Sequence, residues 1–253
     1  MKRQVVDTDL GTDVDDLFAL TYALKNPGCD VVAISTVIGD TIIRAKIARK
    51  LERMLGKNVP IIAGESGSCD SVRKYWTGIE EKALSDEEKK EDFVNSSYPV
   101  YDSETRLVCI GPLTNIALQL RTNPSIRNVK RVYVMGSSES SHNFKADLDS
   151  WKVVQGEKWD IYQITKEVSE KISFDRVELK EFRGNPVGDF LYESAIRWLD
   201  YTKRERACMY DVLTVSAATS DGYVKFDKTA ENRFVSSDVD LNLKDKILEA
   251  VKN

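Results

Sequence analysis

The sequence predicts one α/β domain built on a mainly parallel, open sheet that is flanked by helices. Short runs rich in Val and Ile alternate along the chain with amphipathic helical patterns, which is typical of parallel strands joined by right-handed crossovers. The chain has 253 residues, 42% of them hydrophobic, and no apolar run of about 18 residues that would cross a membrane. We therefore expect residues 1–253 to form a single domain with a sizeable core.

The elements follow in order from periodicity and turn residues. Asn26-Pro27-Gly28 separates the first helix from the second strand, and Gly56 ends the second helix. The predicted strands are 4–7, 29–37, 59–63, 106–110, 132–135 and 158–164, with 223–226 and 233–235 as a pair of edge strands. The predicted helices are 17–24, 41–55, 112–120, 188–202 and 241–251.

Residues 64–100 lose this periodicity and are rich in Gly, Ser and mixed charge. We interpret them as a solvated loop with a short surface helix, and the alternative is a flap over a binding site, because long loops in compact domains are often functional.

Composition limits the possible partners and the compartment. The formal net charge is −4, and basic residues alternate with acidic ones, so we expect no nucleic-acid surface. The chain starts with Met1-Lys2-Arg3-Gln4 and runs directly into the first strand, so we expect a cytoplasmic protein. The cysteines are far apart and show no C-x-x-C spacing, so we expect buried thiols at Cys29, Cys69, Cys109 and Cys208.

The most informative stretch is acidic and follows the first predicted strand. Five carboxylates fall within ten residues, at the end of that strand and in the first turn of the next helix: Asp7, Asp9, Asp13, Asp15 and Asp16. Ligands of open α/β sheets bind at the carboxyl ends of the strands. Helix-dipole stabilisation of about 0.3–1 kcal/mol per carboxylate cannot offset the repulsion among five anions. An oxygen-only donor set therefore predicts a hard cation, Ca²⁺ or Mg²⁺.

Three other interpretations of this stretch can be compared with its spacing. A solvated acidic turn that caps the helix would need no cation. An EF-hand counted from Asp7 needs Gly at its sixth position and an acid at its twelfth, where this chain has Thr12 and Phe18, so it is excluded. A haloacid-type phosphatase shares D-x-D after a strand but expects Thr or Val where Gly11 stands, so it is a weak rival.

Two motifs resemble one family. Asp-Thr-Asp-x-Gly-Thr-Asp-x-Asp-Asp at residues 7–16 resembles the opening motif of the inosine-uridine preferring nucleoside hydrolases, and Gly-Pro-Leu-Thr-Asn-Ile-Ala at residues 111–117 resembles their second hallmark. The resemblance implies a nucleoside hydrolase-like fold with a Rossmann-like core. It also implies calcium-dependent hydrolysis of the N-glycosidic bond of a ribonucleoside or related ribosyl compound, releasing base and ribose.

The resemblance also implies a role for individual residues. The implied Ca²⁺ ligands are Asp9, Asp16, the backbone carbonyl of Ile110, and Asp211. The implied catalytic residues are Asp9, which accepts a proton from water, and Tyr210 at the leaving group. The implied substrate-binding residues are Asp15, Asp40, Asn143 and Ser141. The family also implies a homodimer or homotetramer.

Three positions depart from the family pattern. Asp40 stands in place of an Asn, Ser141 in place of a sugar-binding Glu, and Tyr210 in place of a His credited with protonating the leaving group. His142 corresponds to an aromatic packing residue, so we interpret it as structural. The departures favour an altered substrate, either a ribosyl compound modified at its 5′ position or one whose base needs little protonation. The alternative is a catalytically impaired, calcium-dependent nucleoside- or ribose-binding protein of the same fold.

Overall fold

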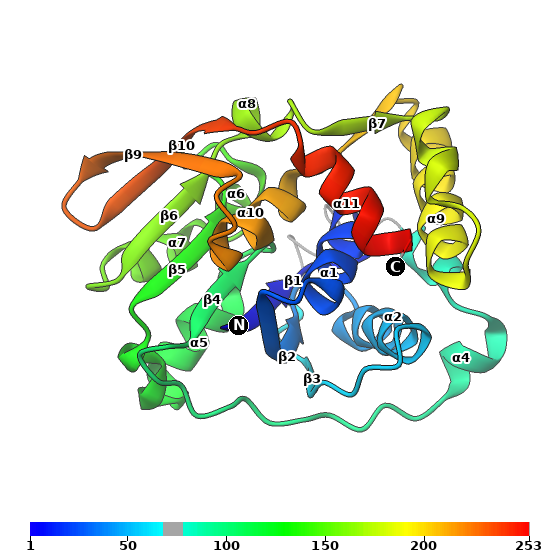
Figure 1. Cartoon of the computed structure of the whole chain (residues 1–253). Helices are drawn as coiled ribbons and strands as arrows, with labels where there is room; N and C mark the ends of the chain where they lie inside the picture. Colours follow the sequence, from blue (N-terminus) through cyan, green and yellow to red (C-terminus); the bar gives the residue numbers. More distant parts are fainter. Residues whose placement is uncertain (68–77, 253) are drawn as a thin grey trace.

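The computed structural model describes residues 1–67 and 78–252, and within them the main element is an eight-stranded sheet of order β3-β2-β1-β4-β5-β6-β10-β9 (Figure 1). Its strands are β1 (Lys2–Thr8), β2 (Cys29–Thr36), β3 (Ile61–Ala63), β4 (Arg106–Cys109), β5 (Arg131–Met135), β6 (Asp160–Ile164), β9 (Val224–Ala230) and β10 (Arg233–Val239). Every neighbouring pair of these strands runs parallel except β9 and β10, which run antiparallel. The predicted α/β class with a mainly parallel open sheet is confirmed.

Helices cover both faces of the sheet (Figure 1). They are α1 (Asp15–Lys25), α2 (Thr41–Met54), α4 (Asp86–Lys90), α5 (Thr114–Thr122), α6 (His142–Ala146), α7 (Leu148–Gln155), α8 (Lys166–Ser169), α9 (Pro186–Thr202), α10 (Tyr210–Thr219) and α11 (Leu243–Lys252), with 3₁₀ turns at Glu80–Ala83, Pro124–Asn128 and Glu178–Phe182. None of the described helices is long and apolar enough to cross a membrane.

The strands divide the core into two layers because successive side chains of a strand point to opposite faces. Val6 packs with the residues of α1, α9, α10 and α11, whereas its neighbour Val5 packs with those of α5 and α7. Both valines are almost fully buried, at 0% and 1% exposure. A strand buried on both faces is typical of parallel sheets and explains the continuous apolar runs in the sequence.

The predicted strands occur within a few residues of their expected bounds, and the expected edge pair is the β9–β10 hairpin. In the segment 64–100, the expected surface helix is α4, whose N-terminus is closed by a capping box between Ser85 and Glu88. Cys29 and Cys109 are buried as expected, while Cys208 is half-buried. Cys69 lies outside the described residues, as do residues 68–77 of the segment expected to form a loop or flap.

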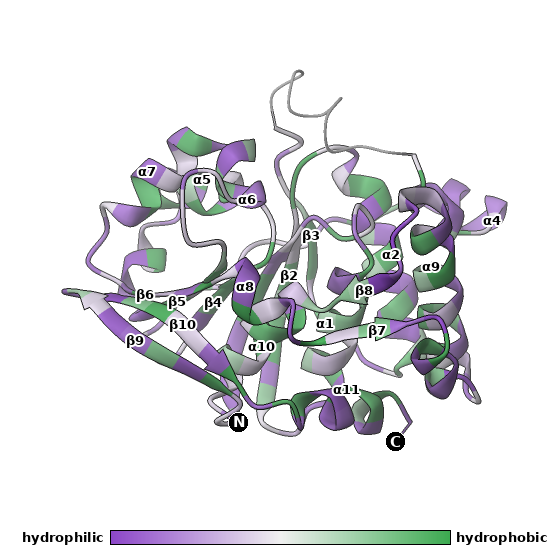
Figure 2. Cartoon of the chain, turned by 90° about the horizontal axis from the view of Figure 1, so that it is seen from above, coloured by the Kyte–Doolittle hydropathy of each residue, from purple (hydrophilic) through white to green (hydrophobic). Residues whose placement is uncertain are grey.

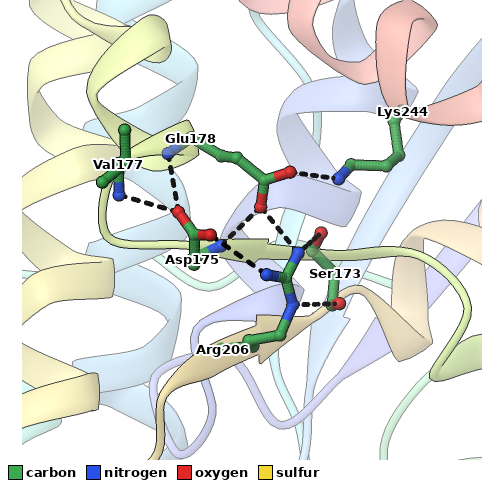
Figure 3. Close-up of polar contacts among 6 residues, drawn as sticks. All are labelled: Ser173, Asp175, Val177, Glu178, Arg206 and Lys244. Atoms are coloured by element: carbon green, nitrogen blue, oxygen red, sulfur yellow. Dashed lines mark hydrogen bonds and ion pairs between the residues drawn. The ribbon is translucent and has the colours of Figure 1, made fainter.

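A second, two-stranded sheet was not predicted. β7 (Ser173–Asp175) and β8 (Arg206–Cys208) pair antiparallel, and each is only three residues long, too short for a periodic signal. Arg206 joins them, donating to the Ser173 carbonyl at 2.9 Å, and its guanidinium also contacts Asp175 and Glu178 (Figure 3). Lys244 of α11 bonds the other oxygen of Glu178 at 2.7 Å. This network fixes β8, which leads directly into α10.

Candidate metal and substrate site

A cavity of about 520 Å³ opens where the carboxyl ends of β1, β4 and β5 meet the start of α10. Its lining comprises Asp9, Thr12, Asp13, Asp15, Asp16, Ile110, Met135, Gly136, Ser137, Ser138, Ser140, Ser141, His142, Asn143, Lys145, Lys166, Glu167, Arg204, Tyr210 and Asp211. Most of the predicted site residues therefore lie around one cavity, although they come from distant parts of the chain. This is the sheet edge at which open α/β folds bind ligands.

Three carboxylates converge at the floor of the cavity. Asp15 and Asp16 lie in the first turn of α1, and Asp211 lies in the first turn of α10. One oxygen from each lies within 4.8 Å of the others, and all three residues are at most 5% exposed. Burial, followed by the neighbouring carboxylates, raises the pKa of Asp15 to about 8 and holds the pKa values of Asp16 and Asp211 well above their ordinary value. The cluster thus needs protons or a cation to balance its charge.

The local backbone explains how these carboxylates are held. The Thr8 hydroxyl at the end of β1 donates to Asp16 and accepts from the amide of Leu10 at 3.1 Å. The amide of Asp211 lies 3.3 Å from Asp15, so the first turns of α1 and α10 are linked. The amide of Asp211 belongs to a helix N-terminus, where negative charge is favoured.

Asp7 does not belong to the cavity lining, although it is part of the acidic stretch. It is buried in the sheet, where its carboxylate accepts hydrogen bonds from Ser35 and, at 2.7 Å, from Asn115. Burial raises the pKa of Asp7 to about 7. Asp7 therefore ties β1 to β2 and α5 and is not placed to bind a ligand in this cavity.

Asp9, Ile110 and Asn143 form the adjoining wall. The carbonyl of Ile110 accepts a hydrogen bond from Asn143 at 3.0 Å, and the Asn143 side chain also reaches the Met135 carbonyl at 3.3 Å. The ends of β1 and β4 approach closely here, since a Cβ at Gly111 would lie 2.8 Å from the Asp9 amide. Glycine at position 111 is therefore required for this approach.

A buried cation behind the acidic loop was not predicted. Arg44 of α2 is 0% exposed, and its guanidinium donates to the carbonyls of Ile38 at 2.7 Å, of Leu10 at 2.6 Å and of Asp9. A fourth bond, of 2.6 Å, reaches the Thr12 hydroxyl. Burial raises the pKa of Asp9, and the positive charge of Arg44 opposes this rise. In the sequence, Arg44 is marked only weakly, as a charged residue next to the apolar positions of α2, Ile43 and Ile47.

Two of the residues that depart from the family pattern, Asp40 and Ser141, differ in whether they reach the cavity. Asp40 is exposed, does not line the cavity, and caps α2 by accepting from the amide of Ile43 at 3.0 Å. Ser141 lines the cavity, and its hydroxyl accepts from the amides of Ser137 and Ser138 at 3.0 and 3.1 Å. The structure thus brings Ser141 to the cavity but not Asp40.

Tyr210 and His142 both line the cavity. The Tyr210 hydroxyl donates to Glu170 at 3.3 Å, and burial raises the pKa of that hydroxyl. His142 is exposed, so it does not pack in the core as its aromatic counterpart in the family is expected to, and our interpretation of it as a structural residue stays a prediction. It occupies the first position of α6, where the side chain projects to the cavity and not into the core.

The donor set fits a hard divalent cation. The converging groups are carboxylates, with the Ile110 carbonyl on the same cavity, and neither His nor Cys belongs to the cluster of Asp15, Asp16 and Asp211. Ca²⁺ and Mg²⁺ both prefer oxygen ligands. The fold and the cavity together define the class, an α/β protein whose sheet edge carries a buried acidic site suited to a metal ion and a small polar ligand.

Comparison with known proteins places the chain within this class. The profile described as inosine-uridine preferring nucleoside hydrolase matches residues 4–247, so the chain belongs to that family. The inosine-uridine preferring nucleoside hydrolase of Crithidia fasciculata is 29% identical over 194 residues, which cover 64% of this chain and 59% of that protein. The matched segments of three further curated relatives span only 63% to 65% of their lengths.

Solved structures share the fold at low sequence identity. A purine-preferring ribonucleoside hydrolase from Gardnerella vaginalis superimposes with a TM-score of 0.78 at 18% identity, covering 99% of this chain and 98% of that chain. The type III effector protein XopQ, solved in complex with adenosine diphosphate ribose, gives a TM-score of 0.76 at 15% identity over 99% of this chain and 92% of that one. The predicted nucleoside hydrolase-like fold is confirmed.

Proposed function

We propose that this protein is a calcium-dependent N-ribohydrolase that cleaves the N-glycosidic bond of a ribonucleoside or related ribosyl compound into base and ribose. The observation that carries the proposal is the convergence of Asp15, Asp16 and Asp211 within 4.8 Å at the floor of the cavity. Three buried carboxylates at one point are strongly unfavourable without a counter-cation. Membership of the nucleoside hydrolase family supports the reaction class.

The proposed metal ligands are Asp9, Asp16, Asp211 and the carbonyl of Ile110, all of which line the cavity. Asp15 lies within the converging cluster as well, so it is close enough to serve both the cation and a sugar hydroxyl. When bound, Ca²⁺ orients sugar hydroxyls and lowers the pKa of water at the site.

The residues of the chain have separate proposed tasks. Asp9 accepts the proton of the attacking water, and its burial favours proton acceptance because it raises the carboxylate pKa. Asp15 and Asn143 hydrogen-bond the ribose hydroxyls. The negative floor stabilises the positive charge that develops on the sugar as the bond to the base breaks.

Tyr210 is proposed to act at the leaving group as a hydrogen-bond donor. Since burial raises its pKa above the ordinary value near 10, its hydroxyl is a weaker acid than histidine at neutral pH. A base that leaves without full protonation suits such a donor. Substrate binding by Ser141 and Asp40 has less support. The Ser141 hydroxyl already accepts hydrogen bonds from two backbone amides, and Asp40 caps α2 outside the cavity lining.

A second candidate function is calcium-dependent binding of a nucleoside or ribose without turnover. The placement of Asp40 and Tyr210 favours it, since one lies outside the cavity lining and the other bonds Glu170. This candidate predicts saturable ligand binding with no product.

The deciding experiment measures release of free reducing sugar from purine, pyrimidine and 5′-modified ribosides, including adenosine diphosphate ribose, with calcium and with chelator. Asp9→Ala is compared with Asp149→Ala, which removes an exposed carboxylate of α7. We expect calcium-dependent release that Asp9→Ala abolishes and Asp149→Ala retains. Ligand binding without release from any riboside would establish the binding protein instead, and unchanged calcium affinity in Asp9→Ala would contradict the ligand assignment.

A further inference from the structure

Three cationic side chains lie at the mouth of the same cavity, opposite in charge to its floor. Lys145 comes from α6, Lys166 from α8, and Arg204 from the segment between α9 and β8. All three residues are exposed, whereas the floor carboxylates are buried. Figure 2 shows α6 and α8 as elements with many hydrophilic residues. We call Lys145, Lys166 and Arg204 the cationic rim.

The contacts of the cationic rim leave its charges available to a ligand. Lys166 lies 3.6 Å from Glu170, in a pair whose side chains are 68% and 46% exposed, and such pairs contribute little to stability. The Arg204 guanidinium stacks over Trp198, 5.2 Å from the ring centre, which leaves its edge donors free of that contact. Lys145 has no ion-pair partner within residues 1–67 and 78–252.

The cavity therefore has two zones of opposite charge. Among the charged lining residues, the exposed ones are the three rim cations and Glu167, Asp13 is half-buried, and the buried ones are all carboxylates. A neutral nucleoside would use the floor, through its sugar hydroxyls, and would leave the rim without a partner. A substrate with an anion at its outer end would use both zones, since complementary charge fixes ligand orientation.

We propose that the natural substrate is a ribosyl compound that carries phosphate on carbon 5 of its ribose, bound by the cationic rim. This inference rests on the proposed function, because it places the hydroxyls of carbons 2 and 3 at the acidic floor. Carbon 5 and the base are then the parts of the substrate that face the mouth. Phosphate is the anion best matched to clustered Lys and Arg donors.

Serine hydroxyls beside the cationic rim could also donate hydrogen bonds to the proposed phosphate. The loop after β5 contributes the hydroxyls of Ser137, Ser138 and Ser140 to the cavity lining. Its amides at 137 and 138 are already bonded to Ser141, so the loop is held in shape by its own side chain. Nucleoside 5′-monophosphates and nucleoside diphosphate riboses share the required ribose 5-phosphate unit.

The test compares binding of ribose 5-phosphate with binding of ribose by calorimetry in the presence of calcium. The variant is Lys145→Gln/Lys166→Gln/Arg204→Gln. The control, with the same change in charge, is Lys152→Gln/Lys228→Gln/Arg183→Gln, at exposed positions outside the cavity lining. Arg183 is a matched partner for Arg204, because it also stacks on an aromatic ring, that of Tyr192.

We expect ribose 5-phosphate to bind at least about tenfold tighter than ribose, an advantage that added salt and the rim variant remove and the control retains. The ratio of kcat/KM for a nucleoside 5′-monophosphate over its nucleoside should fall in parallel. Equal binding of both sugars, or an advantage unchanged in the rim variant, would overturn the phosphate inference and leave the hydrolase function standing. A phosphate advantage without sugar release from any riboside would instead refute the hydrolase and retain the rim.

Discussion

Replacing Arg44 with methionine tests whether this buried guanidinium holds the acidic loop in place. Methionine has a similar length and keeps the apolar contacts of α2, but it donates no hydrogen bond. The substitution leaves the carbonyls of Ile38, Leu10 and Asp9 without this donor in a site where the arginine is 0% exposed. It also removes the cation that opposes the rise in pKa of Asp9 and Asp16.

The expected magnitude follows from these contacts. A hydrogen bond from a charged donor contributes about 1.5–3 kcal/mol, and the losses are not additive because desolvation of the guanidinium is relieved. We expect the free energy of unfolding to fall by about 3–5 kcal/mol, as for a broken buried ionic contact. At about 2–4 °C per kcal/mol for a domain of this size, Tm should fall by about 6–20 °C.

The assay is thermal unfolding together with calcium titration, and the control is Arg53→Met in the same helix. Arg53 pairs with Glu91 at 2.8 Å, but the two side chains are 59% and 46% exposed, so the control should lose less than about 1 kcal/mol. Calcium affinity should weaken in Arg44→Met and stay constant in Arg53→Met. If Tm changes equally in both variants, Arg44 does not anchor the loop, and if only stability falls, Arg44 supports the fold without shaping the metal site.

Three further predictions concern the metal, the leaving group and acid stability. Chelation should lower Tm by about 5–10 °C relative to protein in calcium at 100 times its Kd, since linkage then supplies about 2.7 kcal/mol; an unchanged Tm would argue against a native-state cation. Tyr210→Phe should lower kcat about tenfold or less, because the raised pKa makes its hydroxyl a weak acid, and a loss of a hundredfold or more would identify a true general acid. Glu178 is partly buried, which alone would raise its pKa, but its bonds with Lys244 and Arg206 lower the pKa overall. Its stabilising contribution is therefore present above the unfolded-state pKa and lost as pH falls through the folded-state pKa. Glu178→Gln should destabilise the protein at pH 7, and urea titrations should show the difference shrinking below the ordinary pKa of glutamate and vanishing below the lowered folded-state pKa; a difference that persists in stronger acid would contradict this sign.

Strong periodicity and local turn chemistry made much of the fold predictable. The strands of the main sheet are continuous apolar runs because both faces are buried, and the residues of the acidic stretch lie at a strand end, where ligand sites form. β7 and β8 were missed because three residues carry no period, and their pairing depends on contacts of Arg206 with residues about 30 positions away. Tertiary contacts of this kind have no local signal.

The same limit applies within the site. Asp15 and Asp16 could be predicted as site residues because they are neighbours in the acidic stretch at the start of a helix. Asp7, from the same stretch, instead lies in the sheet, where its carboxylate accepts hydrogen bonds from Ser35 and Asn115. The alternation of side chains along β1 predicts which residues share a face of the sheet. It does not predict which carboxylate will accept hydrogen bonds from buried side chains of other elements. Asp40 was predicted to bind substrate, but it lies directly before α2, and its carboxylate caps that helix instead of lining the cavity.

The buried charges of the site do not balance one another. Within the described part of the chain, the buried guanidinium of Arg44 bonds the Asp9 carbonyl, and four buried carboxylates line the cavity: Asp9, Asp15, Asp16 and Asp211. One positive charge cannot balance four negative ones, so the floor is favourable only with protons or a divalent cation, which makes ligand binding and stability interdependent. The cationic rim cannot supply the missing charge, because its side chains are exposed and screened by solvent while the carboxylates are buried. Its positive charge is therefore better explained by a group on the incoming ligand than by the carboxylates beneath it.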